Sequence, residues 1–315
     1  MIETKFYEVD GSTLSAKVVG KGEPVIIIHG FGMNNNHWLP YALSLSKECQ
    51  FIIPDLRGFG SCCSVYSCYE DSLERHAIDL NALIKIIGVR KPHLMGYSLG
   101  GLTILKYLSM FGDEDISKIT LMDITPKINE SEDWKHPLFG EMNQLRFGTW
   151  QSMYFDFKER FGHSQYAEVP YEQLPHEYQR RISGVLGDFL SDAFKQRWIK
   201  KLITGAAKKH GPLGLFFPMD CWHVFFDHSV SFLHNNYDFR NILSDISVPT
   251  TIISGKKSEV FPFQGQVEMA KSIRGSMQLI QEDSGHMLML DEPRSFYRNF
   301  IQAIEYRKNM DLAPA

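Results

Sequence analysis

KPHLMGYSLGGLTILKYLSMF, residues 91–111, is the stretch that decides the fold. Its first part, 91–98, is a short apolar run typical of a buried strand, and 99–111 is apolar nearly all round, as expected of a buried helix. The junction reads GYSLG, with Ser98 at its centre. A serine there must turn sharply from strand into helix, which lifts its hydroxyl above the sheet, and small flanking glycines leave room for the turn. Ser98 is therefore the candidate nucleophile.

Short apolar runs alternate with longer helical patterns on both sides of this stretch. This alternation predicts an α/β fold with a mostly parallel sheet, opened by an antiparallel hairpin that turns at Asp10-Gly11. The expected strands are 4–11, 13–20, 24–30, 51–55, 91–98, 116–126, 247–255 and 276–283. The expected helices are 38–46, 69–88, 99–111, 262–273 and 292–308.

Residues 127–240 interrupt this alternation. They show helical stretches broken at Pro170, Pro175, Gly211-Pro212 and Pro218, and they hold 22 of the chain's 40 aromatic residues. Their 14 basic and 14 acidic side chains balance, which argues against an electrostatic landing surface. We predict a helical cap (lid) insertion over 127–240, in a core formed by 1–126 and 241–315.

Composition excludes several classes of protein. The chain has 315 residues, 43% hydrophobic and 22% charged, and a net charge of −4, so disorder and nucleic-acid binding are not expected. No apolar run approaches the roughly 18 residues of a membrane helix. The start, MIETKFYEVDG, does not resemble a secretory leader. We therefore expect a soluble, cytoplasmic enzyme whose partner is a small-molecule substrate, and its oligomeric state stays open.

Three of the five cysteines lie close together, at Cys62, Cys63 and Cys68. Zinc sites favour pairs of cysteines two to four residues apart together with a second such cluster, which this stretch does not match. We expect reduced loop thiols and no metal.

A serine hydroxyl needs a base within hydrogen-bonding reach. Among the 12 histidines, His286 follows the last expected strand, on the side of the sheet where Ser98 would also lie. The orienting acid should follow the strand 247–255, where Glu259 is the carboxylate in the loop. Asp123, after the preceding strand, is the alternative, because an acid there could reach the same histidine.

The loop His29-Gly30-Phe31-Gly32 completes the candidate site. Its glycines let the backbone turn towards the nucleophile, so the N–H groups of Phe31 and Leu99 could form an oxyanion hole. His29 itself is expected to hold this loop by hydrogen bonds. Tyr97, next to the nucleophile, is a candidate substrate-binding residue.

Together these segments resemble the α/β-hydrolase fold family, in its capped group of serine esterases and lipases. The matching segments, in the family's order, are HGFG (29–32), PDLRGFG (54–60), GYSLGG (96–101) and SGHMLMLDEP (284–293). The resemblance implies an eight-stranded, mostly parallel sheet, a nucleophile–acid–histidine triad, a lid of inserted helices and no cofactor. It implies a structural role for Asp55 and Arg57. Family members often carry Asp where this chain has Ser258, and an acid one place later would be Glu259.

A serine nucleophile excludes the relatives that attack with aspartate, and it leaves acyl chemistry. The first hypothesis is hydrolysis of a carboxylic ester, thioester or lactone with an apolar or aromatic acyl group. The alternatives are cleavage of a carbon–carbon bond in a β-diketone-type substrate, acyl transfer to an acceptor other than water, and a non-catalytic protein that binds a ligand.

Overall fold

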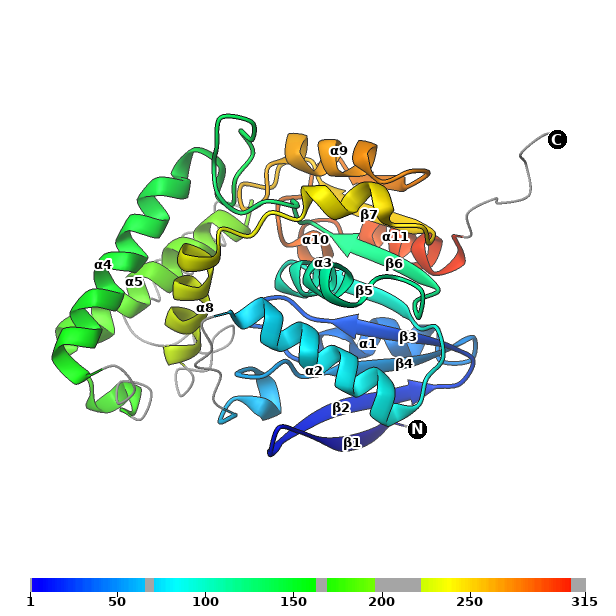
Figure 1. Cartoon of the computed structure of the whole chain (residues 1–315), viewed down its shortest axis with the longest axis horizontal. Helices are drawn as coiled ribbons and strands as arrows, with labels where there is room; N and C mark the ends of the chain where they lie inside the picture. The colour runs from blue at the N-terminus through cyan, green and yellow to red at the C-terminus, as the bar shows by residue number, and fades with distance from the viewer. Residues whose placement is uncertain (1, 66–70, 163–168, 196–221, 307–315) are drawn as a thin grey trace.

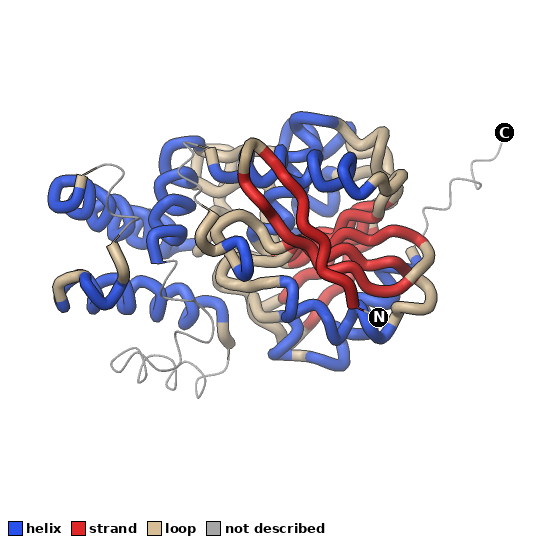
Figure 2. Tube along the Cα trace, turned by 90° about the horizontal axis from the view of Figure 1, so that it is seen from below, coloured by secondary structure: helices blue, strands red, loops and turns tan. Residues whose placement is uncertain are grey.

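A sheet of eight strands forms the centre of the molecule (Figure 2). The structure is a computed structural model that describes residues 2–65, 71–162, 169–195 and 222–306. The strands are β1 (Ile2–Val9), β2 (Ser12–Gly20), β3 (Glu23–Ile28), β4 (Cys49–Pro54), β5 (His93–Tyr97), β6 (Lys118–Met122), β7 (Thr250–Gly255) and β8 (Met277–Gln281). Every strand expected from the sequence is present.

The strand order is β1-β2-β4-β3-β5-β6-β7-β8. The pairs β1–β2 and β2–β4 are antiparallel, and all the other pairs are parallel. The carboxyl ends of the parallel strands therefore meet at one edge of the sheet, where the loops that follow β3, β5, β6, β7 and β8 come together.

Helices cover both faces of the sheet (Figure 1). They are α1 (Leu39–Ser44), α2 (Ser72–Ile87), α3 (Leu99–Phe111), α9 (Phe263–Ser272), α10 (Leu288–Asp291) and α11 (Pro293–Glu305). Within β3, Ile26 and Ile28 pack in the buried cluster that includes α2, α3 and α9, whereas Val25 and Ile27 pack in the cluster of α1, α10 and α11. This two-sided burial explains why the strand is an unbroken apolar run.

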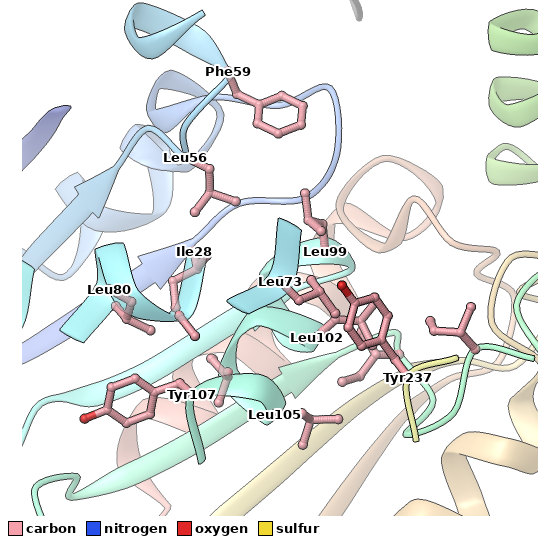
Figure 3. Packing of buried hydrophobic residues seen from close by; sticks show 14 of the residues in the cluster. Ile28, Leu56, Phe59, Leu73, Leu80, Leu99, Leu102, Leu105, Tyr107 and Tyr237 are labelled. Carbon is pink, nitrogen blue, oxygen red and sulfur yellow. The ribbon is translucent and has the colours of Figure 1, made fainter. Parts of the chain in front are cut away.

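Helix α2 shows how the sequence sets the limits of a helix. The Asp71 side chain accepts the Glu74 backbone N–H at 2.8 Å at its start, and Gly88, with φ 73°, ends it. Leu73 of α2 lies in one buried cluster with Leu102 of α3 and with Tyr237 (Figure 3).

The described chain between β6 and β7 is largely helical and forms an insert. It contains α4 (Asn143–Phe161), α5 (His176–Ala193) and α8 (Trp222–Asn235), which Figures 1 and 2 show grouped beyond one end of the sheet. Pro170 and Pro175 precede helical segments as the sequence predicts, whereas 211–212 and 218 lie outside the described residues.

The chain leaves the core and returns to it at nearly the same place. The Phe239 N–H donates to the Pro126 carbonyl at 2.8 Å, and the Ile128 N–H donates to the Tyr237 carbonyl at 3.1 Å. The limits of a separate cap at 127 and 240 stay a prediction. None of the helices in the described part of the chain combines the length and apolarity needed to cross a bilayer.

Candidate active site

Ser98 occupies the turn between β5 and α3 in a strained conformation. Its φ is 53° and its ψ is −120°, a region that side chains with a Cβ rarely enter. A Cβ on Gly100 would lie 2.1 Å from the Ile28 carbonyl oxygen, and one on Gly96 would lie 2.5 Å from the Gly100 carbonyl oxygen. Only glycine fits at these two positions, so the local sequence forces the tight turn that carries the hydroxyl.

His286 lies between Ser98 and Asp123. Its Nε2 is 3.0 Å from the Ser98 Oγ, and its Nδ1 is 2.6 Å from the Asp123 Oδ2. An ionised carboxylate can only accept, so Nδ1 carries the proton and Nε2 is left to accept the serine O–H. All three residues are at most 5% exposed. The arrangement can move a proton from the serine hydroxyl to the imidazole and stabilise the imidazolium that results.

The expectation that Glu259 orients His286 is wrong. Asp123 occupies that position, at the carboxyl end of β6, while the Glu259 side chain is exposed. Ser258 points inward, 8% exposed, and its Oγ donates to the Asp123 Oδ2 at 2.7 Å. Because Ser258 faces the site, the side chain of the following residue faces outward, and an extra methylene cannot bring it back.

Asp123 is fully buried and well satisfied. Besides the histidine and Ser258, it accepts hydrogen bonds from the Gly255 N–H at 3.0 Å and from the Gln266 Nε2 at 2.8 Å. Four donors around one carboxylate fix its direction. Gln266 lies in α9, and no local sequence pattern marks a helix residue as a partner of a distant aspartate.

Tyr97 contacts the histidine directly. Its hydroxyl donates to the His286 carbonyl oxygen at 2.7 Å, and the two rings stack with centroids 5.1 Å apart. Burial, with a smaller effect of Asp123, raises the pKa of Tyr97 well above its ordinary value, so the hydroxyl remains a donor. Tyr97 also lines a pocket beside Ser98, and its contact with substrate stays a prediction.

The glycine loop after β3 lies against the serine turn. A Cβ on Gly30 would come within 2.8 Å of the Tyr97 ring, so glycine permits this close approach. Phe31 and Leu99 line the same pocket as Ser98, and Leu99 is the first residue of α3, where helix N–H groups carry a partial positive charge. An oxyanion hole formed by these two N–H groups stays a prediction.

Two pockets meet at Ser98, and both are also lined by Phe31 and Phe189. The first, called here the aromatic pocket, lies beneath the insert and measures about 450 Å³ with the open space at its mouth. Its walls include Phe139, Trp150, Phe225, His228 and Phe232. The second, called here the methionine pocket, measures about 880 Å³ on the same basis and is lined by His286, Met33, Tyr41, Met287, Met289 and Leu290.

His29 and Arg57, which lie near the site, both have hydrogen-bond partners in the structure. His29 donates from Nδ1 to the Gly30 carbonyl at 2.8 Å, and its Nε2 accepts the Leu56 N–H at 3.0 Å. Arg57 donates to both carboxylate oxygens of Asp79, at 2.9 and 3.0 Å. These contacts hold the loops after β3 and β4 in place.

The cysteine cluster departs from expectation at one position. Cys62 is a free thiol, with its pKa raised by burial, whereas Cys63 is disulfide-bonded, so the expectation of reduced thiols is wrong for Cys63. Cys68 lies outside the described residues. Within the described ranges, no group of three His, Cys, Asp or Glu side chains is arranged to hold a metal ion.

Comparison with known proteins agrees with this geometry. The family described as alpha/beta hydrolase fold matches residues 23–293, which is most of the chain. The chain belongs to the α/β-hydrolase fold family. It is 24% identical over 281 residues to an AB hydrolase superfamily protein of Bacillus subtilis, covering 89% of this chain and 91% of that protein.

Two further proteins that are similar to this chain are described as esterases. A bifunctional esterase/perhydrolase of Acinetobacter calcoaceticus is 24% identical over 244 residues, covering 76% of each chain. The solved structure of an esterase from Exiguobacterium antarcticum superposes with a TM-score of 0.68 at 23% identity, covering 95% of this chain and 97% of that one. This structural likeness shows that the two chains share a fold.

Proposed function

We propose that the protein is a serine hydrolase that cleaves carboxylic esters with an apolar acyl group. The observation that carries the proposal is the line of hydrogen bonds from the Ser98 hydroxyl through His286 to Asp123. Ser98 is the nucleophile, His286 the general base and acid, and Asp123 the residue that fixes the tautomer of the imidazole.

The reaction proceeds in two halves. Ser98 Oγ attacks the ester carbonyl carbon while its proton moves to His286 Nε2, and the N–H groups of Phe31 and Leu99 stabilise the negative oxygen. Collapse breaks the bond to the alcohol oxygen, which takes the proton from Nε2. Water then attacks the acyl-enzyme with the same histidine as base, which releases the acid and restores Ser98.

The position of His286 supports an assignment of the alcohol and acyl halves of the substrate to the two pockets. The leaving alcohol must receive its proton from Nε2, so it lies in the methionine pocket, whose lining includes His286. The acyl group lies in the aromatic pocket, where His228 is the titratable group among the described lining residues. His228 uses both ring nitrogens in hydrogen bonds to Val224 and His76, so an uncharged acyl chain is favoured.

The bond type is tested with a substrate panel. Simple esters, thioesters, lactones and a β-diketone are assayed with the wild type and with Ser98→Ala. Turnover of the esters that is lost in the variant supports the proposal. Turnover of the diketone alone would select carbon–carbon hydrolysis, and binding without turnover of any substrate would select a ligand-binding role.

The assignment of the pockets is tested with a matched pair of truncations at partly exposed positions. Phe232→Ala enlarges the aromatic pocket and should shift the preference towards longer acyl chains at constant alcohol. Leu290→Ala enlarges the methionine pocket and should shift the preference among alcohols at constant acyl group. If Phe232→Ala instead changed the preference among alcohols and Leu290→Ala the preference among acyl chains, the assignment of the two pockets would be reversed.

A further inference from the structure

Two buried histidines join the insert to the core next to the aromatic pocket. His76 belongs to α2 and His228 to α8, and Figure 1 shows that α2 begins close to α8. The two Nε2 atoms are 2.9 Å apart, and the rings stack with centroids separated by 5.2 Å. Both residues are at most 2% exposed. The proposed mechanism gives neither of them a proton to transfer.

The hydrogen bonds determine where the protons lie. Nδ1 of His228 is 2.8 Å from the Val224 carbonyl oxygen, which can only accept, so this nitrogen carries the proton. Nε2 of a neutral His228 is then an acceptor, and Nε2 of His76 must donate to it. Nδ1 of His76 is left as a buried acceptor with no hydrogen-bond partner among the described residues. In the structure both histidines are therefore neutral, and His76 Nε2–H donates the hydrogen bond to His228 Nε2.

A second proton would have nowhere favourable to go. On His76 it would sit on Nδ1, buried and without an acceptor within the described part of the chain. The charged and titratable groups that act on His76 offer no compensation: they are His228 from α8, His29 after β3, Arg57 after β4 and Arg75 on α2, and all lower its pKa, as burial does more strongly. Asp79 is engaged by both arginines. Burial likewise lowers the pKa of His228 to about 4.

The histidine pair contacts the loop of residues 29–32, called here the oxyanion loop, through aromatic rings. The Phe31 ring packs edge-on against His228, with centroids 5.6 Å apart, and against Phe59 at 5.2 Å. Phe59 in turn packs on His228 at 5.3 Å. The side chain of Phe31, whose backbone N–H is the candidate oxyanion donor, therefore packs directly on a ring of the histidine pair.

We propose that His76 is a positioning residue: its Nε2–H holds His228 against Phe31 and so aligns the oxyanion loop, and a second proton on the pair releases that loop. The inference rests on the proposed ester hydrolysis. It implies that protonation of the pair contributes a separate loss of activity in acid.

Two variants at position 76 distinguish loss of the hydrogen-bond donor from loss of the titratable group. His76→Gln keeps an N–H donor near the position of Nε2 but does not titrate. His76→Phe keeps a ring but loses the donor. His93→Gln is the matched control, because His93 is also a buried histidine, bonded through Nε2 to Thr120 at 2.8 Å, but it lies at the opposite end of β5 from Ser98.

Ester kcat and KM are measured from pH 3.5 to 8, with circular dichroism at each pH to confirm that each protein is folded. At pH 7 we expect His76→Phe to lose about tenfold in kcat with KM within twofold, because the oxyanion contact is made mainly in the transition state. His76→Gln should keep at least half of the wild-type kcat.

Below about pH 4 the wild type and His93→Gln should lose activity more steeply than His76→Gln, in which His228 is the one member of the pair that can still take up a proton. Equal acid limbs for the wild type and His76→Gln, or a wild-type kcat in His76→Phe, would overturn the positioning role alone. Absence of both ester turnover and a Ser98 adduct in the wild type would overturn the proposed function, and this inference with it.

Discussion

Asp123→Asn should nearly abolish ester hydrolysis while leaving the fold intact. Asp123 receives four donors, from His286, Ser258, Gln266 and the Gly255 backbone. An asparagine offers one acceptor oxygen and a donating NH₂ group in the same space, so at least one donor meets another donor. Of the four donors, we expect His286 to adjust most easily, because it can change its tautomer. Its Nε2 then carries the proton and can no longer accept from Ser98.

The corresponding change in a serine protease lowers kcat about 10⁴-fold, which is about 5 kcal/mol of transition-state stabilisation. We expect a loss of 10³ to 10⁴-fold here. The assay is kcat/KM for an activated ester together with the rate at which a fluorophosphonate modifies Ser98. Glu259→Gln is the matched control and should remain within about threefold of the wild type.

A second substitution makes the test sharper. Since the Ser258 Oγ lies 2.7 Å from the Asp123 Oδ2, a carboxylate at position 258 can reach the same cluster of donors. Ser258→Asp in the Asp123→Asn background should recover tenfold or more of the lost activity. A loss below tenfold in Asp123→Asn, or a loss in Glu259→Gln as large as in Asp123→Asn, would refute this role of Asp123.

Three further predictions follow from the buried groups. Burial lowers the pKa of His223 and of His228 to about 4 from 6.5, so below pH 6.5 the unfolded chain binds protons that the folded chain does not. The free energy of unfolding in urea should therefore fall between about pH 6.5 and 4, by the order of 3 kcal/mol for each histidine, and a stability that stays flat over this range would contradict their burial as neutral groups. Tyr97→Phe removes the hydrogen bond to the His286 carbonyl and should lower kcat about fivefold with little change in KM, corresponding to about 1 kcal/mol; a change confined to KM would indicate that Tyr97 serves substrate binding instead. Phe296→Ala should destabilise the fold by about 3–5 kcal/mol in chemical denaturation without changing the kcat of the folded protein, because Phe296 is fully buried in the layer of α1 and α11.

The sequence predicted the features that depend on neighbouring residues. The apolar runs, the turn at Asp10-Gly11 and the end of α2 at Gly88 all follow from local periodicity and glycine geometry. Ser98 was found in the same way, because its turn needs glycines at fixed distances along the chain. His286 was found because it directly follows the last strand.

Contacts between distant residues were harder to predict, and the choice between Asp123 and Glu259 was made wrongly. Asp123 and Ser258 are 135 positions apart, and only the parallel pairing of β6 with β7 brings their loops to one place. A useful signal was present, because Asp123 directly follows a strand and Ser258 fills the place of the usual family acid. The His76–His228 pair, 152 positions apart, had no such signal.

The central claim is that Ser98 is the nucleophile, and active-site labelling tests it most directly. The wild type is treated with a fluorophosphonate at pH 7, and the adduct is located by mass spectrometry of the intact protein and its peptides. We predict one adduct per chain, on Ser98, with loss of ester hydrolysis in proportion to labelling, and no adduct in Ser98→Ala. An enzyme that hydrolyses esters yet remains unlabelled, or a Ser98→Ala variant with normal activity, would contradict it.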